Sequence, residues 1–351
     1  MLNKIILENS IQKAKKMIEQ GDKIVIVTHV SPDGDAVGSS LALYHFLLEW
    51  GKEVNVLVPN NFPGFLKWMD GARDIIVAEW RENTAKELIQ AAEWMFCLDF
   101  NAPKRIEPIN RWLETAKAQK IMIDHHLYPE NFCDVTISHP EISSTSELIF
   151  RFICRMGMFD VMNRSCAECI YAGMMTDTGA FTYNSNDKHI YYIIGELLEK
   201  GIDKDGIYDK IYNRYSESRL RLQGYVLYEK MKIYEPYHTA LITLSYEEQL
   251  RFQWKKGDTE GFVNLPLSIE GIVFSAFIRE EENRVKISLR SQGNFPANQF
   301  AAEVFNGGGH LNASGGDFDG KLEDAVELFE KALSKYSNQL TFFTAQPSPI
   351  L

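Results

Sequence analysis

The first half of the chain alternates short apolar runs with amphipathic stretches. Runs with the length of buried strands are KIVIV (23–27), VNVLV (54–58), WMFCL (94–98) and KIMI (120–123). The stretch AVGSSLALYHFLLEWG has apolar residues at helical spacing and ends at Gly51, a residue typical of helix C-terminal caps. Strands that alternate with helices in this way predict a parallel sheet covered by helices.

The remainder of the chain has a different pattern. Residues 188–231 are helical in pattern and charged, and we interpret them as a connector. Beyond them, HTALITLSY, GIVFSAFIRE and RVKISLRS predict strands, and PANQFAAEVF and LEDAVELFEKALSKY predict helices. We therefore predict an α/β protein with a first domain at 1–187, the helical connector at 188–231, a smaller α+β C-terminal domain at 232–337 and a loosely attached tail at 338–351.

The composition is that of an ordinary soluble globular protein, with 45% hydrophobic and 24% charged residues among 351. No apolar run approaches the roughly 18–20 residues that cross a bilayer. The N-terminal stretch lacks the apolar core and the small-residue cleavage site of a signal peptide. These features predict a cytoplasmic protein without a membrane span.

The five cysteines fit this placement. Cys97, Cys133 and Cys154 stand alone in apolar surroundings, as small buried side chains do. Cys166 and Cys169 form a CxxC pair, but no second Cys or His pair stands at zinc-finger spacing. The sequence therefore argues against a structural zinc site, and an intracellular location argues against disulfides.

The net charge of −11 argues against binding to long duplex nucleic acid, because release of counterions from many phosphates requires a basic face. A small phosphorylated substrate held by metals or by a few arginines remains compatible with this charge.

Histidines and aspartates cluster directly after three of the predicted strands. These residues are His29, Asp33, Asp35, Asp99, Asp124, His125 and His126. In an open parallel sheet, ligands bind outside the carboxyl ends of the strands, so these side chains should converge on one edge. We expect Asp177, in the Gly-bearing loop TDTG, to supply a further carboxylate.

Each of these residues alone has a plain structural interpretation. An Asp after a strand commonly forms a turn or caps a helix, and a lone His is commonly a structural residue. Several carboxylates at one edge, however, repel each other unless cations neutralise them. Asp and His without thiolates suit Mn²⁺, Mg²⁺, Fe²⁺ or Co²⁺. There are enough ligands for two metals, which can clamp the oxygens of a phosphoryl displacement.

Five segments together resemble the DHH phosphoesterase superfamily. IDHH (123–126) is preceded by HVSPDGDAVGS and followed by MMTDTGAF, and the last third contains VKISLRS and FNGGGHLNASGG. The last two are similar to the arginine and GGGH motifs of the DHH-associated C-terminal domain. The joint pattern covers nearly the whole chain and resembles the branch of nanoRNases and 3′-phosphoadenosine 5′-phosphate (pAp) phosphatases.

The resemblance implies two metal positions that share Asp99. The ligands of one would be His29, Asp33 and Asp99, and those of the other Asp35, Asp99, His125 and Asp177. His126 would lie near the scissile phosphate, and Asp124 would orient the neighbouring histidines.

The resemblance also implies substrate-binding residues in the C-terminal domain. Arg290 would form a fork with a phosphate, and Gly307, Gly308 and Gly309 would let the backbone approach a ligand, with His310 as a donor. Without the resemblance, GGGH is a flexible loop and Arg290 a solvated strand residue. Arg105, shortly after Asp99, is either a further substrate contact or a surface charge.

The activity implied is hydrolysis of short oligoribonucleotides to mononucleotides and of pAp to AMP, through in-line attack by a metal-bridging hydroxide. Two divalent ions would be required, most readily Mn²⁺, with Mg²⁺, Co²⁺ or Fe²⁺ as alternatives. A cyclic-dinucleotide phosphodiesterase (substrates c-di-AMP or pApA) is the alternative within the class, and a non-catalytic nucleotide sensor is the alternative outside it. The GGGH motif argues against an inorganic pyrophosphatase, and the sequence leaves a homodimer open.

Overall fold

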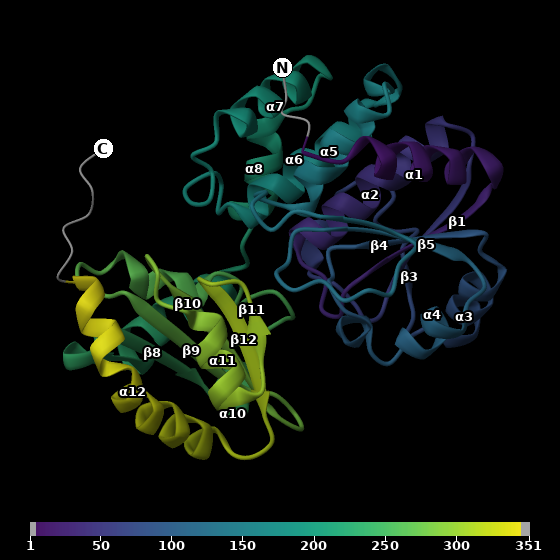
Figure 1. Ribbon diagram of the computed structural model, residues 1–351. Helices are drawn as coiled ribbons and strands as arrows, with labels where there is room; N and C mark the ends of the chain where they lie inside the picture. Colours follow the sequence, from purple (N-terminus) through teal and green to yellow (C-terminus); the bar gives the residue numbers. More distant parts are fainter. Residues whose placement is uncertain (1–4, 345–351) are drawn as a thin grey trace. The chain divides into compact units, whose positions relative to one another are not determined.

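The computed structural model describes residues 5–344 and divides into two compact units, Met1–Arg214 (unit 1) and Tyr215–Leu351 (unit 2) (Figure 1). The segment 188–231, expected as a connector, contributes helices to both units. Of the tail expected at 338–351, residues 345–351 lie outside the described part.

Unit 1 is built on a six-stranded sheet in which every pair of neighbouring strands is parallel. Its strands are β1 (Lys23–Thr28), β2 (Glu53–Val58), β3 (Ile76–Val77), β4 (Trp94–Leu98), β5 (Gln119–Asp124) and β6 (Val135–Ser138), in the order β3-β2-β1-β4-β5-β6. The predicted helix-covered parallel sheet is confirmed. The pattern analysis did not identify β3 and β6, which are short.

Helices cover both faces of this sheet. They are α1 (Glu8–Gln20), α2 (Gly34–Glu49), α3 (Glu82–Ala91), α4 (Asn110–Thr115), α5 (Thr145–Arg155), α6 (Arg164–Asp177), α7 (Lys188–Glu199) and α8 (Lys204–Tyr212), with short 3₁₀ turns η1 (Gly64–Leu66), η2 (Pro103–Ile106) and η3 (Phe159–Val161). One core includes Ile24 and Ile26 of β1 with α1, α2, α5 and α6, and the other includes Val25 and Val27 with α3 and α4. Because successive strand residues point to opposite faces, a strand buried on both sides is apolar throughout.

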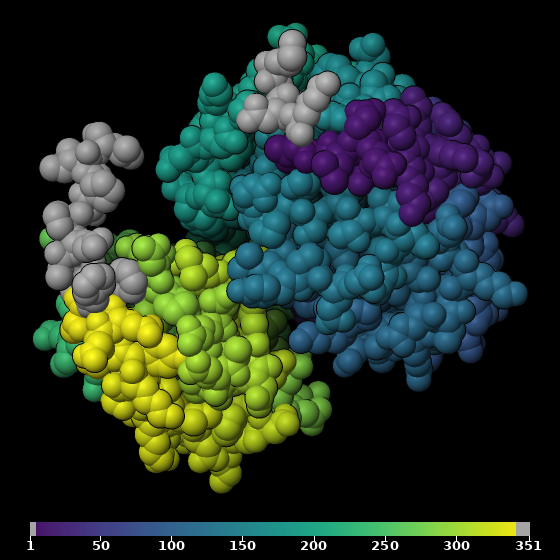
Figure 2. All heavy atoms as spheres, in the orientation of Figure 1, coloured from purple at the N-terminus to yellow at the C-terminus, as the bar shows by residue number. Residues whose placement is uncertain are grey.

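Helix α1, drawn in purple, lies on the surface of unit 1 (Figures 1 and 2). Its buried positions Ile11, Ala14, Met17 and Ile18 follow helical spacing, and the intervening polar residues face outward. This spacing makes α1 an amphipathic surface helix.

The strand order reverses between β1 and β4, which lie side by side at the centre of the sheet. In the register of the three central strands, Thr28 pairs with Leu98 and Leu98 with Ile123. The residues that follow, His29, Asp99 and Asp124, therefore lie at the same level at the carboxyl edge of the sheet. Such a reversal point is where open α/β sheets bind ligands.

Helices α2 and α6 pack against each other at two glycines. A Cβ atom on Gly38 would lie 2.7 Å from the carbonyl oxygen of Cys169 and 2.9 Å from the amide nitrogen of Gly173. Only glycine lets the two backbones approach this closely. The contact brings the N-terminal turn of α2, with Asp35, beside the C-terminal turn of α6, with Asp177.

Unit 2 contains a second, mixed sheet of six strands in the order β11-β12-β10-β9-β8-β7. Its strands are β7 (Met231–Tyr234), β8 (Thr239–Leu244), β9 (Phe274–Glu280), β10 (Val285–Ser291), β11 (Gly308–Gly309) and β12 (Ala313–Phe318). Its helical elements are α9 (Glu217–Tyr225), the π-helix η4 (Val226–Lys230), η5 (Glu235–Tyr237), α10 (Tyr246–Arg251), η6 (Phe262–Ser268), α11 (Ala297–Phe305) and α12 (Leu322–Thr344).

Phenylalanines from α11 and α12 pack on one face of this sheet, and Leu222, Val226 and Phe262 pack on the other. The predicted α+β character of this part is confirmed. Among the strands described up to residue 344, β8 and β9 pair in parallel and the other neighbours of this sheet are antiparallel.

The structure corrects one expectation about the end of the chain. Helix α12 continues through Thr344, so residues 338–344 do not belong to an irregular tail. Leu333, Tyr336 and Leu340 are buried at helical spacing and anchor this part of the helix in the core of unit 2. Polar residues around Leu340 hid the pattern in the sequence. Within residues 5–344, no helix is long and apolar enough to span a membrane.

Candidate metal centre

His29 and Asp33 lie in the loop between β1 and α2. Asp33 caps α2, because its Oδ1 accepts hydrogen bonds from the amides of Asp35 and Ala36 at 3.0 Å each. The same oxygen lies 4.0 Å from Nε2 of His29, whose Nδ1 is 2.9 Å from the carbonyl oxygen of Val30. Asp33 therefore caps α2, as an aspartate after a strand commonly does, and it also lies beside His29.

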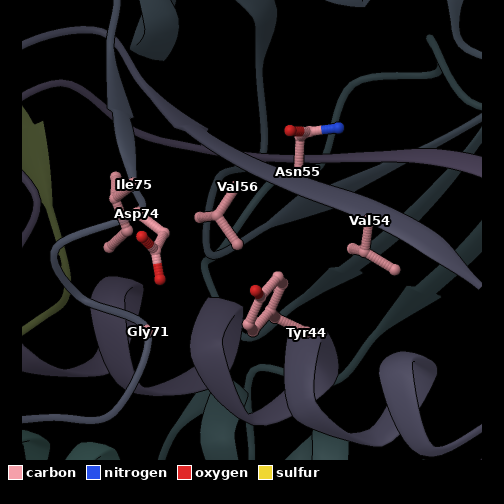
Figure 3. A pocket seen from close by; sticks show the side chains of 7 residues that line it. All are labelled: Tyr44, Val54, Asn55, Val56, Gly71, Asp74 and Ile75. Atoms are coloured by element: carbon pink, nitrogen blue, oxygen red, sulfur yellow. The ribbon is translucent and has the colours of Figure 1, made fainter.

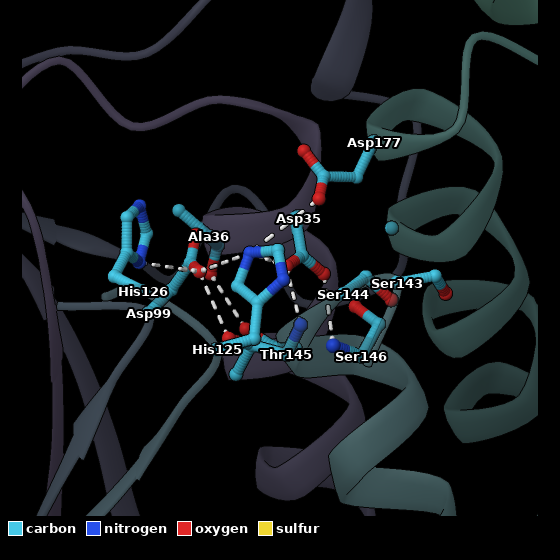
Figure 4. A network of polar contacts seen from close by, with 12 residues as sticks. Asp35, Ala36, Asp99, His125, His126, Ser143, Ser144, Thr145, Ser146 and Asp177 are labelled. Carbon is cyan, nitrogen blue, oxygen red and sulfur yellow. Dashed lines mark hydrogen bonds and ion pairs between the residues drawn. The ribbon is translucent and has the colours of Figure 1, made fainter. Parts of the chain in front are cut away.

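A second group consists of Asp35, His125 and Asp177. Nε2 of His125 lies 3.4 Å from Oδ2 of Asp177 and 3.9 Å from Oδ2 of Asp35, and Nδ1 lies 3.1 Å from the carbonyl oxygen of Ile142 (Figure 4). Asp177 is the last residue of α6, so its carboxylate comes from a helix end and not from the loop that the sequence suggested.

Asp99 lies between the two groups. Its Oδ2 is 3.4 Å from Nε2 of His29, and its Oδ1 is 3.6 Å from Nε2 of His125. Potential ligand atoms of His29, Asp33 and Asp99 lie within 4.8 Å of one another, as do those of Asp35, His125 and Asp177. The structure thus brings all six residues proposed as ligands into two adjoining sets.

His126 is held by its own neighbour. Asp124 accepts the backbone N–H of His126 at 3.0 Å, and its Oδ1 lies 2.7 Å from Nδ1 of the imidazole. On the other side of the ring, Nη2 of Arg105 lies 3.4 Å from Nε2. Asp124 therefore contacts His126, whereas His125 is held by the carbonyl of Ile142. The sequence leads us to expect that Asp124 orients both neighbouring histidines, and the contacts described here are those with His126.

Burial and like charges make these groups interdependent. Burial, together with the carboxylates of Asp99 and Asp177, raises the pKa of Asp35. Burial lowers the pKa of His125, but Asp177, Asp99 and Asp35 outweigh it and raise the value to about 9. A divalent cation at this position would favour the ionised carboxylates and the neutral imidazole, which are the forms that bind metals.

Residues in the left-handed backbone region concentrate around this site. In the described part of unit 1, the residues other than glycine with positive φ are Ser31, Asp99, Tyr128, Ala180, Phe181 and Asn184. All lie in segments that follow β1, β4, β5 or α6, the elements that carry the two ligand sets. Each such residue costs of the order of 1–3 kcal/mol and persists where the surroundings fix it.

The sequence analysis missed a group of hydroxyl-bearing residues, Ser143 to Ser146, at the start of α5. Thr145 donates its hydroxyl to Oδ1 of Asp99 at 2.8 Å, and the amides of Thr145 and Ser146 donate to Asp35 at 2.6 and 2.8 Å. A signal was present, because SSTSE (143–147) has the Ser-x-x-Glu spacing of a helix start. That spacing does not reveal which carboxylates the helix start contacts.

In unit 2, Arg290 is half-buried near the end of β10, and its Nη1 donates to the carbonyl of Leu289 at 2.9 Å. The residue pairs with Ala313 of β12. The amide of His310 donates to the carbonyl of Ala313 at 2.8 Å. Arg290 and the GGGH segment therefore share one end of the second sheet.

Within the GGGH segment, Gly308 and Gly309 form the short strand β11, which pairs with β12. A Cβ on Gly307 would clash with the carbonyl of Gly315, and one on Gly309 would lie 2.5 Å from the carbonyl of Ala313. Gly307 and Gly309 therefore allow β12 to pack closely against this segment. A Cβ on Gly308 would meet no heavy atom within 4 Å, so this glycine has open space around its Cα.

In the part of the chain that the structure describes, the cavities include two that lie outside the ligand sets. One of about 60 Å³, between α2 and β2, is lined by Tyr44, Val54, Asn55, Val56, Gly71, Asp74 and Ile75 (Figure 3). The other, of about 230 Å³, is lined by Glu141, Ile142, Ser143, Glu147, Asn184, Asn186, Asp187 and Ile190. The second adjoins the candidate metal centre, because Ile142, whose carbonyl contacts His125, is one of its lining residues.

The cysteines take no part in the two ligand sets. Cys97, Cys166 and Cys169 are buried, and burial raises the pKa of Cys166 and Cys169. All five are free thiols.

Comparison with known proteins identifies the two parts of the chain. Residues 23–174 match the N-terminal domain of the DHH family, and residues 237–335 match the DHHA1 domain. A protein of Thermus thermophilus named bifunctional oligoribonuclease and PAP phosphatase NrnA is 30% identical, over 91% of this chain and 90% of the relative. The chain belongs to the DHH family. The resemblance of its motifs to this family is thereby confirmed.

Solved structures give the same fold for this DHH protein. An exopolyphosphatase-related protein from Bacteroides fragilis is 61% identical, with a TM-score of 0.93, over 97% of this chain and all of the other. RecJ from Thermus thermophilus in complex with Mn²⁺ is 13% identical, with a TM-score of 0.52, over 98% of this chain and 55% of RecJ. The likeness to RecJ shows a shared fold alone.

Proposed function

We propose that this DHH protein is a dimetal phosphoesterase that hydrolyses short oligoribonucleotides to mononucleotides and pAp to AMP. The observation that carries the proposal is the position of Asp99, which offers one oxygen to His29 at 3.4 Å and the other to His125 at 3.6 Å. A carboxylate placed in this way can bridge two cations. The name of the Thermus relative supports the choice of substrates.

The two cations would be held by the two sets described above. One set is His29, Asp33 and Asp99, and the other is Asp35, Asp99, His125 and Asp177. Oxygen and imidazole donors without thiolate suit Mn²⁺, Mg²⁺, Co²⁺ or Fe²⁺, and we propose Mn²⁺. When bound, a cation pair supplies an activated water and stabilises charge on the phosphoryl oxygens.

His126 and Arg105 would contact the scissile phosphate. Asp124 fixes the orientation of His126, so that Nε2 points to Arg105 at 3.4 Å. An anionic phosphate oxygen at this point would receive a charge-assisted hydrogen bond from Arg105, and a second one from Nε2 of His126 when that nitrogen carries a proton. Arg105 thus becomes a substrate contact in this proposal.

In unit 2, we assign substrate binding to Arg290, Gly308 and His310. A guanidinium recognises a second phosphate through paired hydrogen bonds, and an exposed glycine lets the backbone approach a ligand. Gly307 and Gly309 would support this segment from behind by their packing against β12. Unit 2 then selects the substrate, and unit 1 carries the chemistry. The proposal includes the division of the chain into a catalytic domain (1–187), a connector and a substrate-binding domain (232–337). It also includes a cytoplasmic location.

The test is a substrate panel with the purified chain. Dinucleotide RNA, a 24-mer RNA, pAp, cyclic di-AMP and pyrophosphate are incubated with the protein in Mn²⁺, with and without a chelator. We expect fast release of mononucleotides from the dinucleotide and of phosphate from pAp, and no turnover with the chelator. Preference for cyclic di-AMP would establish the alternative phosphodiesterase. Preference for pyrophosphate, or no turnover of any substrate, would contradict the proposal, and binding without turnover would favour a nucleotide sensor.

Asp99→Ala is the matched variant for this assay. Because one carboxylate serves both positions, we expect loss of activity and of both metals, measured by elemental analysis after gel filtration. Two retained metals with near-normal turnover would refute the bridging role.

A further inference from the structure

Residues 142–146, at the start of α5, contact three of the residues proposed as metal ligands. The carbonyl oxygen of Ile142 lies 3.1 Å from Nδ1 of His125. The amides of Thr145 and Ser146 donate to the two oxygens of Asp35 (Figure 4). One short segment therefore contacts a histidine and an aspartate that are 90 residues apart in the chain, and it also reaches Asp99.

Thr145 is the residue of this turn that touches both aspartates. Its amide donates to Oδ2 of Asp35 at 2.6 Å, and its hydroxyl donates to Oδ1 of Asp99 at 2.8 Å. All three residues are almost fully buried. Asp35 belongs to one proposed ligand set, and Asp99 is shared by both. Thr145 thus links the carboxylate between the two sets to a second carboxylate of one set.

The direction of these hydrogen bonds matters for charge. Two buried carboxylates repel each other, and donors at a helix start favour their ionised form and fix their rotation. Oδ1 of Asp99 accepts the hydroxyl of Thr145 with one lone pair, and its second lone pair is available on the side of His125. The carboxylates are consequently oriented before any cation arrives.

The turn is itself locked by buried side chains behind it. Ser144 caps α5 by accepting the amide of Glu147, and Ser143 donates its hydroxyl to Glu147 at 2.6 Å. Glu147 also forms a buried ion pair with Arg151 at 2.6 Å. Since these groups are nearly inaccessible to solvent, the turn has little freedom to rotate.

We propose that Thr145 is a positioning residue that presets the bridging carboxylate Asp99 and Asp35 for two cations. The inference rests on the proposed dimetal function and extends it to a residue that touches neither substrate nor cation. Its hydroxyl restricts the rotation of the Asp99 carboxylate in advance, so that less rotational freedom is lost when cations bind. Groups that orient metal ligands in this way typically change metal affinity about 10- to 100-fold when they are removed.

The experiment measures Mn²⁺ binding by equilibrium dialysis and elemental analysis, which needs no substrate. Thr145→Val keeps the shape of the side chain and removes the hydroxyl, and Thr145→Ser restores the hydroxyl without the methyl group. The control is Thr239→Val in unit 2, where a buried threonine donates to the carbonyl of Tyr237 at 2.7 Å. Melting temperatures of the metal-free proteins show whether the variants are folded. Should Thr145→Val be insoluble, Thr145→Ala replaces it.

We expect Thr145→Val to weaken Mn²⁺ binding roughly 10- to 100-fold, with KM for the dinucleotide unchanged at saturating Mn²⁺. Thr145→Ser and Thr239→Val should bind Mn²⁺ like the wild type. Wild-type affinity in Thr145→Val, or equal losses in Thr145→Ser or Thr239→Val, would overturn the inference. Absence of Mn²⁺ binding to the wild-type chain would instead overturn the proposed function, so the two failures are distinguishable.

Discussion

Asp124 holds His126 by two contacts, a backbone hydrogen bond of 3.0 Å and a 2.7 Å approach of Oδ1 to Nδ1 of the ring. Both histidines approach Oδ1 of Asp99, His125 at 3.6 Å and His126 at 3.7 Å, but the preceding residue His125 also lies beside Asp177 and the carbonyl of Ile142. Two adjacent histidines thus have different surroundings, which gives them different proposed tasks.

This difference yields a first expectation. His125→Ala should lose metal, because Nε2 is a proposed ligand, whereas His126→Ala should keep the metal content and lose most of its turnover. Asp124→Asn should resemble a milder His126→Ala, with about 10- to 100-fold lower activity. Elemental analysis and initial rates decide the matter, and equal loss of metal in the two histidine variants would show that the assigned roles are wrong.

A second expectation concerns the contact of α2 with α6. Gly38→Ala places a methyl group 2.7 Å from the carbonyl of Cys169, and a backbone atom cannot move aside cheaply. Overpacking of this kind costs about 1–3 kcal/mol, more than the gain in helix propensity. We expect a melting temperature lower by several degrees, measured by calorimetry. Gly195→Ala in α7, where nothing lies within 4 Å, is the matched control and should be neutral or stabilising.

A third expectation tests the proposed division of labour. Arg290→Ala and His310→Ala should lower kcat/KM for dinucleotides and pAp by roughly 10- to 100-fold, as the loss of one charge-assisted contact does. Hydrolysis of bis-p-nitrophenyl phosphate, which has no second phosphate, should change little, and metal content should stay constant. Lys286→Ala, on the same half-exposed side of β10, controls for loss of positive charge. Equal loss of the artificial activity would place these residues in the catalytic machinery.

A fourth expectation concerns acid stability of unit 2. Burial raises the pKa of Glu248, but hydrogen bonds from Lys230, Tyr225 and the amide of Ser245 outweigh it and lower the value from 4.5 to about 2. The unfolded chain therefore binds this proton more readily than the folded one. The stability that Glu248 contributes is complete above pH 4.5 and is lost as the pH falls toward 2.

Thermal unfolding between pH 2 and 6 measures this effect. Glu248→Gln should lower the melting temperature at pH 6 and flatten its decline in acid. Glu247→Gln changes an exposed neighbour in the same helical turn and should follow the wild-type curve. Parallel curves for wild type and Glu248→Gln would contradict the expectation.

The sequence by itself determined the parallel sheet and the edge at which the candidate site lies. Apolar runs that end in His29, Asp99 and Asp124 require only strand periodicity and the rule that parallel strands end on one side. These are local properties, encoded within a few residues of each other. The strands β9 and β10 were likewise predicted from local periodicity.

Tertiary structure alone decided which side chains meet. Thr145 contacts Asp35 across 110 residues of sequence, and Arg105 reaches His126 across 21. The placement of Asp177 depends on the close packing of α6 on α2 at Gly38, and the roles of Gly307 and Gly309 depend on β12 behind them. The spacing of apolar residues in the sequence does not indicate such contacts, because they follow from how helices and strands pack after they have formed. The local sequence pattern thus specified the helices and strands and the His and Asp residues at the strand ends. Tertiary packing specified the residues that orient those side chains.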